Sequence, residues 1–309
     1  MTNTTYGEFQ VANEYLDDPT QLETVFQRDG YLFFRGVIDV SEILQVKHDL
    51  IQLFQAQGVV KTGESEPIWT GAELDKVDDV ALYSSTSYAA LSEGAAKRLA
   101  EKVFGVPAFM FGNPNLRYTL PDHSMYVTPA HQDFFFIQGT SFFRTLWIPL
   151  MDIDDEVGGL AVAAGSHKGG LREHAEQEGV YSYVFKGRRQ KGVKLEDIHD
   201  PWLTTDYHAG DVLIFHNLTL HWGLPNHSNR IRLSMDTRAQ PAAAPRTLQI
   251  EKSILELREY RREVQRIATE EGADEAFFEV VLIEMMKRGL KPERASIKTV
   301  MSQLDRQTT

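Results

Sequence analysis

Two histidines and one carboxylate are spaced in a pattern that can hold a metal ion. His131 and Asp133 are separated by one residue in AHQDFFF, and His221 ends a later β-type run, 88 residues after Asp133. On an extended strand, residues i and i+2 point to the same face, so an imidazole and a carboxylate at this spacing can reach one ion. Two histidines and a carboxylate that leave other coordination positions open form the facial triad of non-haem iron(II) oxygenases. The pattern therefore predicts His131, Asp133 and His221 as metal ligands and catalytic residues.

An arginine follows the distal histidine at a spacing that fits a carboxylate co-substrate. Arg232 lies eleven residues after His221 in RIRLS, and strand alternation places Arg232 and Ser234 on one face. A guanidinium binds a carboxylate through two parallel N–H···O bonds, which a lysine cannot reproduce. If this face looks inward, Arg232 and Ser234 can share the distal carboxylate of a dicarboxylate whose other end chelates the metal.

The elements that must position these residues are short strands. Between residues 108 and 240, β-type runs alternate with Gly, Pro, Asn and Asp, a pattern typical of an all-β sandwich or barrel. The runs are PAFMFG, NLRYTL, DFFFIQG, RTLWIPLMDI, GLAVAAG, DVLIFHN and RIRLSMDTR. Helical periodicity flanks this region, over residues 20–28 (with Thr20 as the expected N-cap), 41–56, 89–104, 248–268 and 274–287. An apolar strand, YLFFRGVI, follows the first helix.

These elements predict a chain that is mainly β with flanking helices. Residues 1–107 are expected to form N-terminal helices and opening strands that pack on the core, residues 108–240 the catalytic β-core, and residues 241–309 a C-terminal helical extension. Together they are expected to form one structural domain. The extension is interpreted as a cover for the core or as the contact of a homodimer.

Composition excludes several other classes of protein. The chain has 309 residues, with 32 basic and 44 acidic side chains and a net charge of −12. This balance argues against unspecific binding to nucleic acid or to anionic membranes. The absence of cysteine excludes disulfides, iron–sulfur clusters and thiol nucleophiles. Neither a signal peptide nor an apolar run of about 20 residues is recognisable, which predicts a cytoplasmic protein.

Several motifs, in their order and spacing, resemble the phytanoyl-CoA dioxygenase family. They are DGYLFFRGVID (29–39), HQD (131–133), WIPL (147–150), GGLAVAAGSHKGG (158–170), HAGDVLIFHNLTLHWG (208–223) and RIRLS (230–234). The resemblance implies a double-stranded β-helix (jelly-roll, cupin-like) core. It also implies iron(II), dioxygen, and 2-oxoglutarate that is decarboxylated to succinate and carbon dioxide.

The resemblance also assigns roles to individual positions. His131, Asp133 and His221 match the iron ligands, and Arg232 matches the arginine that binds the co-substrate. Trp147, Asn115 and Arg117 match regions that line the co-substrate pocket. Two further positions can be compared with the pattern of the family. Gly223 stands where the family often has a hydroxyl residue, whereas Asp133 keeps the carboxylate that halogenating relatives replace, which favours oxygenation.

The sequence thus predicts a dioxygenase that hydroxylates or otherwise oxidises a C–H bond of a small organic molecule. Candidate substrate-pocket residues flank the triad or lie in the irregular segment 60–84. They are Trp69, Tyr126, Phe135, Gln138, Arg144 and Trp222. The other histidines are weaker candidates, and His174 is expected to be exposed.

Two other classes of function remain open at this point. A cupin-like metal-dependent isomerase, or a dioxygenase that does not use 2-oxoglutarate, would share the triad without needing Arg232. A non-catalytic binding module on the same β-fold would have no chemical reason to retain a complete set of iron ligands.

Overall fold

The computed structural model describes residues 5–73, 85–111, 114–122, 127–137, 140, 143–181, 189–244, 262–274, 277–278, 281–282, 285 and 292–308. The chain divides into two compact units, Met1–Pro245 and Arg246–Thr309. Each unit is described by itself.

Among the described elements, the first unit contains all the named strands and every named helix except α9. Its helices are α1 (Pro19–Asp29), α2 (Val40–Ala56), α4 (Thr86–Leu91), α5 (Lys97–Phe104) and α6 (Asp133–Ile137), with single turns at Asn13–Tyr15, Ser92–Ala96, Ser166–Gly169 and Leu195–Asp197. Its strands are β1 (Tyr31–Phe34), β2 (Ala108–Met110), β3 (Asn115–Thr119), β4 (Arg144–Pro149), β5 (Leu160–Ala163), β6 (Ala175–Tyr181), β7 (Arg189–Gly192), β8 (Trp202–Leu203), β9 (Val212–His216), β10 (His221–Gly223) and β11 (Arg232–Pro241).

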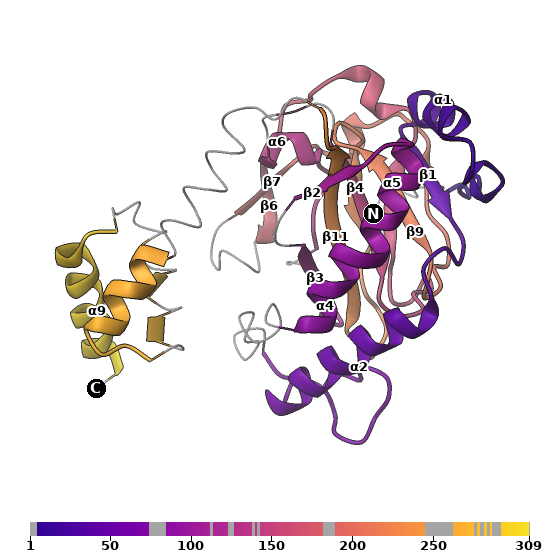
Figure 1. Ribbon diagram of the computed structural model, residues 1–309. Coiled ribbons are helices and arrows are strands. Elements are labelled where there is room, and N and C mark those ends of the chain that lie inside the picture. Colours follow the sequence, from indigo (N-terminus) through magenta and orange to yellow (C-terminus); the bar gives the residue numbers. More distant parts are fainter. Residues whose placement is uncertain are drawn as a thin grey trace. The chain divides into compact units, whose positions relative to one another are not determined.

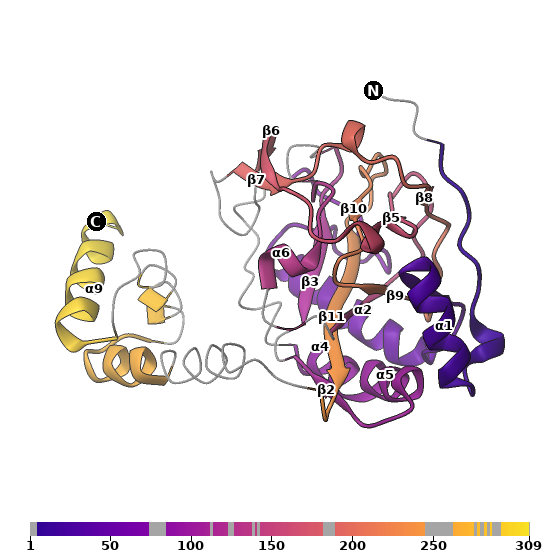
Figure 2. The ribbon, with the colours of Figure 1, turned by 90° about the horizontal axis from the view of Figure 1, so that it is seen from above.

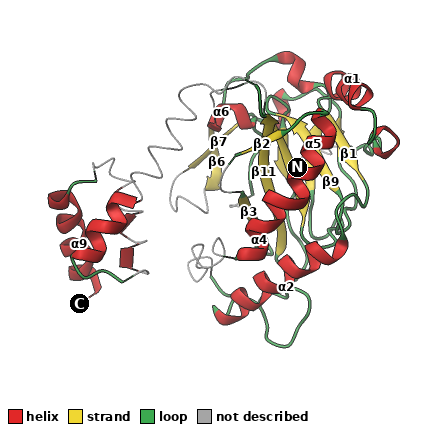
Figure 3. Cartoon of the chain, in the orientation of Figure 1, coloured by secondary structure: helices red, strands yellow, loops and turns green. Residues whose placement is uncertain are grey.

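The described strands form two antiparallel sheets and a separate hairpin, and Figure 3 shows the strands of the large sheet side by side, with the hairpin of β6 and β7 next to them. The large sheet has the order β1-β9-β4-β11-β2, and β3 also pairs with β11. The small sheet has the order β10-β5-β8, and β6 pairs with β7. This arrangement confirms the predicted double-stranded β-helix. Six of the seven predicted β-runs contain a strand, whereas the described residues of the seventh, DFFFIQG, form a helix over Asp133–Ile137.

Helices cover one face of the large sheet, and the small sheet lies on its other face. Figures 1 and 2 show α2, α4 and α5 together on the covered face, where α5 packs against β11 and β2. Because both faces are covered, every residue of β1 and β4 is buried, and so is every residue of β11 except Pro241. The side chains of β11 that face the small sheet are therefore shielded from solvent, and several of these buried side chains are polar or charged.

The first helix begins earlier than the sequence predicts. The expected N-cap was Thr20, but the helix begins at Pro19 and its N-cap is Asp18. The Asp18 carboxylate accepts hydrogen bonds from the backbone N–H groups of Thr20 and Gln21. Proline suits the first helical position because its missing N–H would have no intrahelical partner there.

The second unit has an apolar core of its own. Helical residues 262–270 and α9 (Arg294–Thr308) contribute Val264, Ile267, Ile297 and Val300, all buried. The predicted helices 248–268 and 274–287 lie partly outside the described residues, and α9 was not predicted. The predicted domain boundaries, and the packing of the C-terminal helices on the β-core, stay predictions. Among the described helices, none is long and apolar enough to cross a membrane.

Candidate metal centre and active site

A backbone pairing brings the two candidate histidines side by side. His131 and His221 form an antiparallel bridge in which each residue's N–H donates to the carbonyl oxygen of the other, at 3.0 and 3.1 Å. His221 is also the first residue of β10, which pairs with β5 in the small sheet. The two imidazole rings consequently lie 4.1 Å apart, centroid to centroid.

Asp133 reaches the same point from a helix instead of a strand. The run DFFFIQG was predicted to be extended, but Asp133 is the first residue of the short helix α6. The chain leaves the sheet after His131, and the N–H of Phe134 donates to the carbonyl of Asn217. Aromatic residues favour strands only where a neighbouring strand can pair with them, so this local context overrides their β-propensity.

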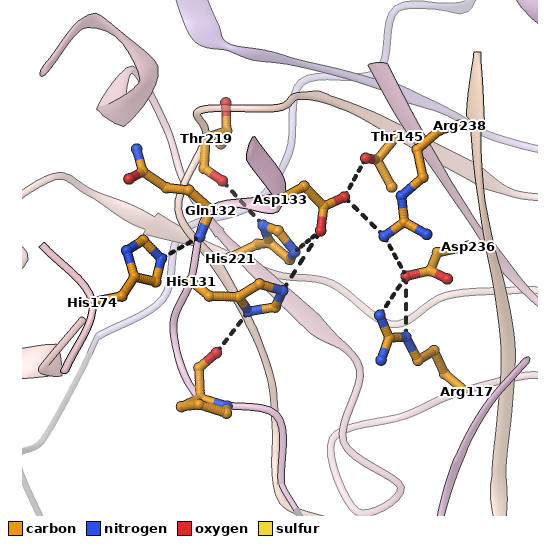
Figure 4. A network of polar contacts seen from close by, with 11 residues as sticks. Arg117, His131, Gln132, Asp133, Thr145, His174, Thr219, His221, Asp236 and Arg238 are labelled. Carbon is orange, nitrogen blue, oxygen red and sulfur yellow. Dashed lines mark hydrogen bonds and ion pairs between the residues drawn. The ribbon is translucent and has the colours of Figure 1, made fainter. Parts of the chain in front are cut away.

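The three side chains meet at distances that suit a metal ion (Figure 4). Oδ1 of Asp133 lies 3.7 Å from Nε2 of His131 and 3.8 Å from Nε2 of His221. All three ligand atoms lie within 4.8 Å of one another, and the three residues are buried. Among the described residues, they form the one cluster of His, Asp or Glu side chains that could hold a metal ion. The predicted triad therefore assembles.

Hydrogen bonds orient both imidazoles for metal binding. Nδ1 of His131 lies 2.8 Å from the carbonyl oxygen of Pro129, and Nδ1 of His221 lies 3.0 Å from that of Thr219. A carbonyl oxygen accepts, so each Nδ1 carries the hydrogen and each Nε2 presents its lone pair to the centre. Burial, together with the neighbouring His131, lowers the pKa of His221 to about 3.

Asp133 is held as an ionised ligand by two donors. Burial opposes its ionisation, but the Arg238 guanidinium and the two histidines outweigh this and hold the carboxyl pKa well below its usual range. Oδ2 accepts hydrogen bonds from Oγ1 of Thr145 and, at 3.0 Å, from Nη2 of Arg238. Oδ1 is thereby left to face the histidines. Sequence reasoning missed Thr145 and Arg238, although Arg238 shares the inward face of β11 with Arg232 and Ser234.

Gln132, between two ligands of the triad, fixes the loop that carries them. Its amide nitrogen donates to the carbonyls of Gly170 and Leu218, and its amide oxygen accepts from the N–H of Arg172. The backbone N–H of Gln132 donates to Nε2 of His174. His174 is 7% exposed, so the prediction that it is exposed was wrong. Its burial follows from this hydrogen bond and from its stacking on Phe135 at 4.1 Å.

Arg232 lies in the interior at the end of β11, as its predicted role requires. Its Nη1 donates to the carbonyl oxygens of Gly158, Gly159 and Leu224 at 2.6–3.3 Å. A Cβ atom at position 223 would lie only 3.1 Å from Nη2 of Arg232, so Gly223 makes room for the guanidinium. Ser234 Oγ is fully buried and has no hydrogen-bond partner among the described residues.

The other predicted co-substrate residues lie on the strands beside β11. Trp147 on β4 is the cross-strand partner of Asp236, and its ring meets that of Tyr207 edge to face at 4.7 Å. Arg117 on β3 forms an ion pair with Asp236, and Asn115 is in register with the same residue. Binding of a co-substrate by these side chains stays a prediction.

The described residues among those predicted to line the substrate pocket lie in different surroundings, and their binding of substrate stays a prediction. Trp69 packs against the main hydrophobic core, and its indole N–H donates to the carbonyl of Ala72. Trp222 follows His221 on β10, so the two side chains point to opposite faces of the strand. The Trp222 ring packs in an apolar cluster with Trp202. Arg144 forms an ion pair with Glu23 and stacks on Phe26, and both of these residues belong to α1. Tyr126 and Gln138 lie outside the described residues.

Among the described residues near the triad, Phe136 presents an exposed aromatic ring at the edge of the site. Phe135, which was predicted to contact substrate, is half-buried and stacks on His174. The Phe136 side chain is 55% exposed, and its ring lies 5.5 Å from the imidazole of His131. Phe136 was not among the predicted pocket residues, because the run DFFFIQG was predicted to be extended, whereas residues 133–137 form α6 and Phe136 is exposed there.

A facial triad on a double-stranded β-helix defines the class of non-haem metal oxygenases. The model of the phytanoyl-CoA dioxygenase family matches residues 26–234. Two curated relatives, each described as 1-deoxypentalenic acid 11-beta-hydroxylase, come from Streptomyces arenae and Streptomyces exfoliatus. They are 34% identical over 256 residues and 33% identical over 262 residues, and each alignment covers 80% of this chain and 89% of the relative. The chain therefore belongs to the phytanoyl-CoA dioxygenase family, which confirms the predicted family and the predicted oxygenase class.

Solved structures share the fold at lower identity. The epimerase SnoN, in complex with Fe3+, alpha ketoglutarate and nogalamycin RO, is 23% identical with a TM-score of 0.51, over 73% of this chain and 85% of its own. The apo form of the non-heme monooxygenase ThoJ is 16% identical with a TM-score of 0.53, over 71% of this chain and 77% of its own. These likenesses support the fold.

Removal of the carboxylate ligand is expected to abolish tight metal binding. Asp133→Ala takes away one of three ligands and leaves Arg238 beside the site, so we expect ferrous ion affinity to fall about a hundredfold or more, beyond the loss typical for outer-sphere partners. Anaerobic calorimetric titration of the apo-protein measures this. Asp206→Ala, which removes an exposed carboxylate, is the matched control. Equal affinities in both variants would contradict the assignment of Asp133.

Proposed function

We propose that His131, Asp133 and His221 bind iron(II), and that the protein uses 2-oxoglutarate and dioxygen to oxidise a C–H bond of a small organic molecule, with succinate and carbon dioxide as co-products. The observation that carries this proposal is the buried cluster of two imidazole nitrogens and one carboxylate oxygen in a chain of a dioxygenase family. Nitrogen and oxygen donors that leave coordination positions open suit non-haem iron(II).

The interior of β11 fits a dicarboxylate co-substrate. Arg232 and Ser234 are both buried on the inward face of this strand, and the Ser234 hydroxyl lacks a partner among the described residues. The guanidinium is suited to binding the distal carboxylate through two parallel hydrogen bonds, and Ser234 can supply the hydroxyl that Gly223 lacks. Iron with bound 2-oxoglutarate supplies the oxidising chemistry, and the protein supplies orientation and exclusion of water.

The edge of the site favours an apolar substrate. Phe136 presents an exposed ring next to His131, and an exposed aromatic side chain gains free energy when an apolar ligand covers it. The two curated relatives are described as hydroxylases of 1-deoxypentalenic acid. We therefore infer that the substrate is an apolar small molecule that approaches the metal past Phe136. The predicted homodimer and the predicted cytoplasmic location stay predictions.

The co-substrate assignment predicts a charge-transfer band that depends on Arg232. Anaerobic addition of iron(II) and 2-oxoglutarate to the wild-type protein is expected to give the weak visible band of the chelate. In Arg232→Ala, the 2-oxoglutarate concentration for half-maximal absorbance should rise roughly 10- to 100-fold, because charge-assisted hydrogen bonds contribute about 1.5–3 kcal/mol.

The matched control for this titration is Arg230→Ala. Arg230 lies two residues earlier and forms an ion pair with Asp154, so its removal should leave the titration unchanged. If iron binds to the wild type but no band forms, the 2-oxoglutarate assignment is wrong. A metal enzyme that does not use 2-oxoglutarate, such as an isomerase, then becomes the better account.

The substrate class predicts a stimulation of 2-oxoglutarate turnover. We expect 1-deoxypentalenic acid and comparably apolar acids to accelerate succinate formation, whereas amino acids and sugars should not. Phe136→Ser should raise the concentration needed for half-maximal stimulation about tenfold, since it removes an apolar contact of about 1.5 kcal/mol or more. Leu44→Ser, at an exposed leucine of α2, is the control. Stimulation by the polar compounds alone would contradict the inference.

A further inference from the structure

The metal ligand Asp133 is one end of a chain of alternating charges that runs through the β-core (Figure 4). Nη2 of Arg238 donates to Oδ2 of Asp133 at 3.0 Å and to Oδ2 of Asp236 at 3.2 Å. Asp236 accepts two further hydrogen bonds from Arg117, at 3.0 Å from Nε and 2.9 Å from Nη2. The order is therefore carboxylate, guanidinium, carboxylate, guanidinium.

The pairing of β4 with β11 places two hydrogen-bond donors next to one oxygen of Asp133. Thr145 and Arg238 are direct cross-strand partners of β4 and β11, so both donors to Oδ2 come from one rung of the large sheet. Asp236 lies two residues before Arg238 on β11, and strand alternation places both on the same face. The donors are thus fixed by backbone pairing.

Burial makes these contacts strong and costly to break. The side chains of Asp133, Asp236 and Arg238 are each at most 8% exposed, and Arg117 is the more accessible end at 25%. A buried carboxylate needs compensation by charge and hydrogen bonds, and here Arg238 provides both. Asp236 in turn offsets part of the Arg238 charge, so that Asp133 still carries negative charge toward an ion.

We propose that Arg238 is a positioning residue that restricts Asp133 to one-oxygen metal binding. With Oδ2 engaged by Arg238 and Thr145, only Oδ1 faces the two Nε2 atoms, and the carboxylate cannot rotate to offer both oxygens. This rests on the proposed function, because a second carboxylate oxygen on the metal would occupy a position that the co-substrate or dioxygen needs. Asp236 and Arg117 keep the Arg238 guanidinium in place.

The test uses the metal alone as the probe, with cobalt(II) as a spectroscopic substitute for iron(II). The visible spectrum of bound cobalt reports the coordination number. In Arg238→Met, we expect cobalt affinity to fall about tenfold, the range typical when an outer-sphere partner of a ligand is lost. We also expect the spectrum to change toward a higher coordination number, as Asp133 becomes free to bind through both oxygens.

Three variants accompany it. Arg238→Lys, which restores a hydrogen-bond donor for Oδ2 of Asp133, should recover most of the affinity. Thr145→Val, which removes the other donor without removing a charge, should give a smaller shift in the same direction and covers the case that Arg238→Met does not fold. Arg144→Met, which removes a buried guanidinium from the neighbouring position on β4, should leave both affinity and spectrum unchanged.

The outcomes separate the two claims. If the wild type binds neither iron(II) nor cobalt(II), the proposed function itself is wrong and the positioning role fails with it. If the wild type binds metal but Arg238→Met and Thr145→Val keep the wild-type affinity and spectrum, the function stands and the positioning role of Arg238 is overturned.

Discussion

The site depends on one non-local interaction, the pair of backbone hydrogen bonds between His131 and His221. These residues are far apart in the sequence, and the pairing sets their imidazoles side by side without any bond between the side chains. Backbone hydrogen bonds in a buried sheet have no water to replace them, so the pairing is hard to open. Metal binding can therefore use ligands that are already close together, and little ordering of the chain is needed when the ion arrives.

The surrounding polar groups are arranged to keep that geometry. Backbone carbonyls fix the two imidazoles, and Gln132 connects the ligand loop to segments 170–172 and 218. On the other side, Thr145 and Arg238 fix the carboxylate. The helices on the large sheet act indirectly, since they bury its outer face and leave the inner face of β11 for charged side chains. The same strand carries Arg232 and Ser234 at one end and Asp236 and Arg238 farther along, so one element organises the proposed co-substrate contacts and the metal ligand.

Most strands of the core and the three triad residues could be predicted from the sequence, because both depend on the types of residues and on their spacing along the chain. Alternation and turn residues located six of the seven predicted strands of the core, and the types and spacing of His131, Asp133 and His221 indicated the metal cluster. The prediction failed where tertiary contacts decide local structure. DFFFIQG was predicted to be a strand, but its described residues, 133–137, form the helix α6. His174 was predicted to be exposed, but a hydrogen bond to Gln132 and stacking on Phe135 bury it.

The contacts of the buried charged side chains of β11 could not be predicted from the sequence either. Alternation places Asp236 and Arg238 on the same face as Arg232, but only the register between β4 and β11 shows that Arg238 meets Thr145 and Asp133.

The central claim is that the three side chains hold a ferrous ion with coordination positions left open. The most direct measurement is electron paramagnetic resonance of the anaerobic iron(II) protein after addition of nitric oxide, which binds only at an open position. The account predicts the high-spin iron–nitrosyl signal at one iron per chain in the wild type, and its loss in His221→Ala. Iron bound at that stoichiometry without a nitrosyl signal would show a closed coordination sphere and would contradict the account.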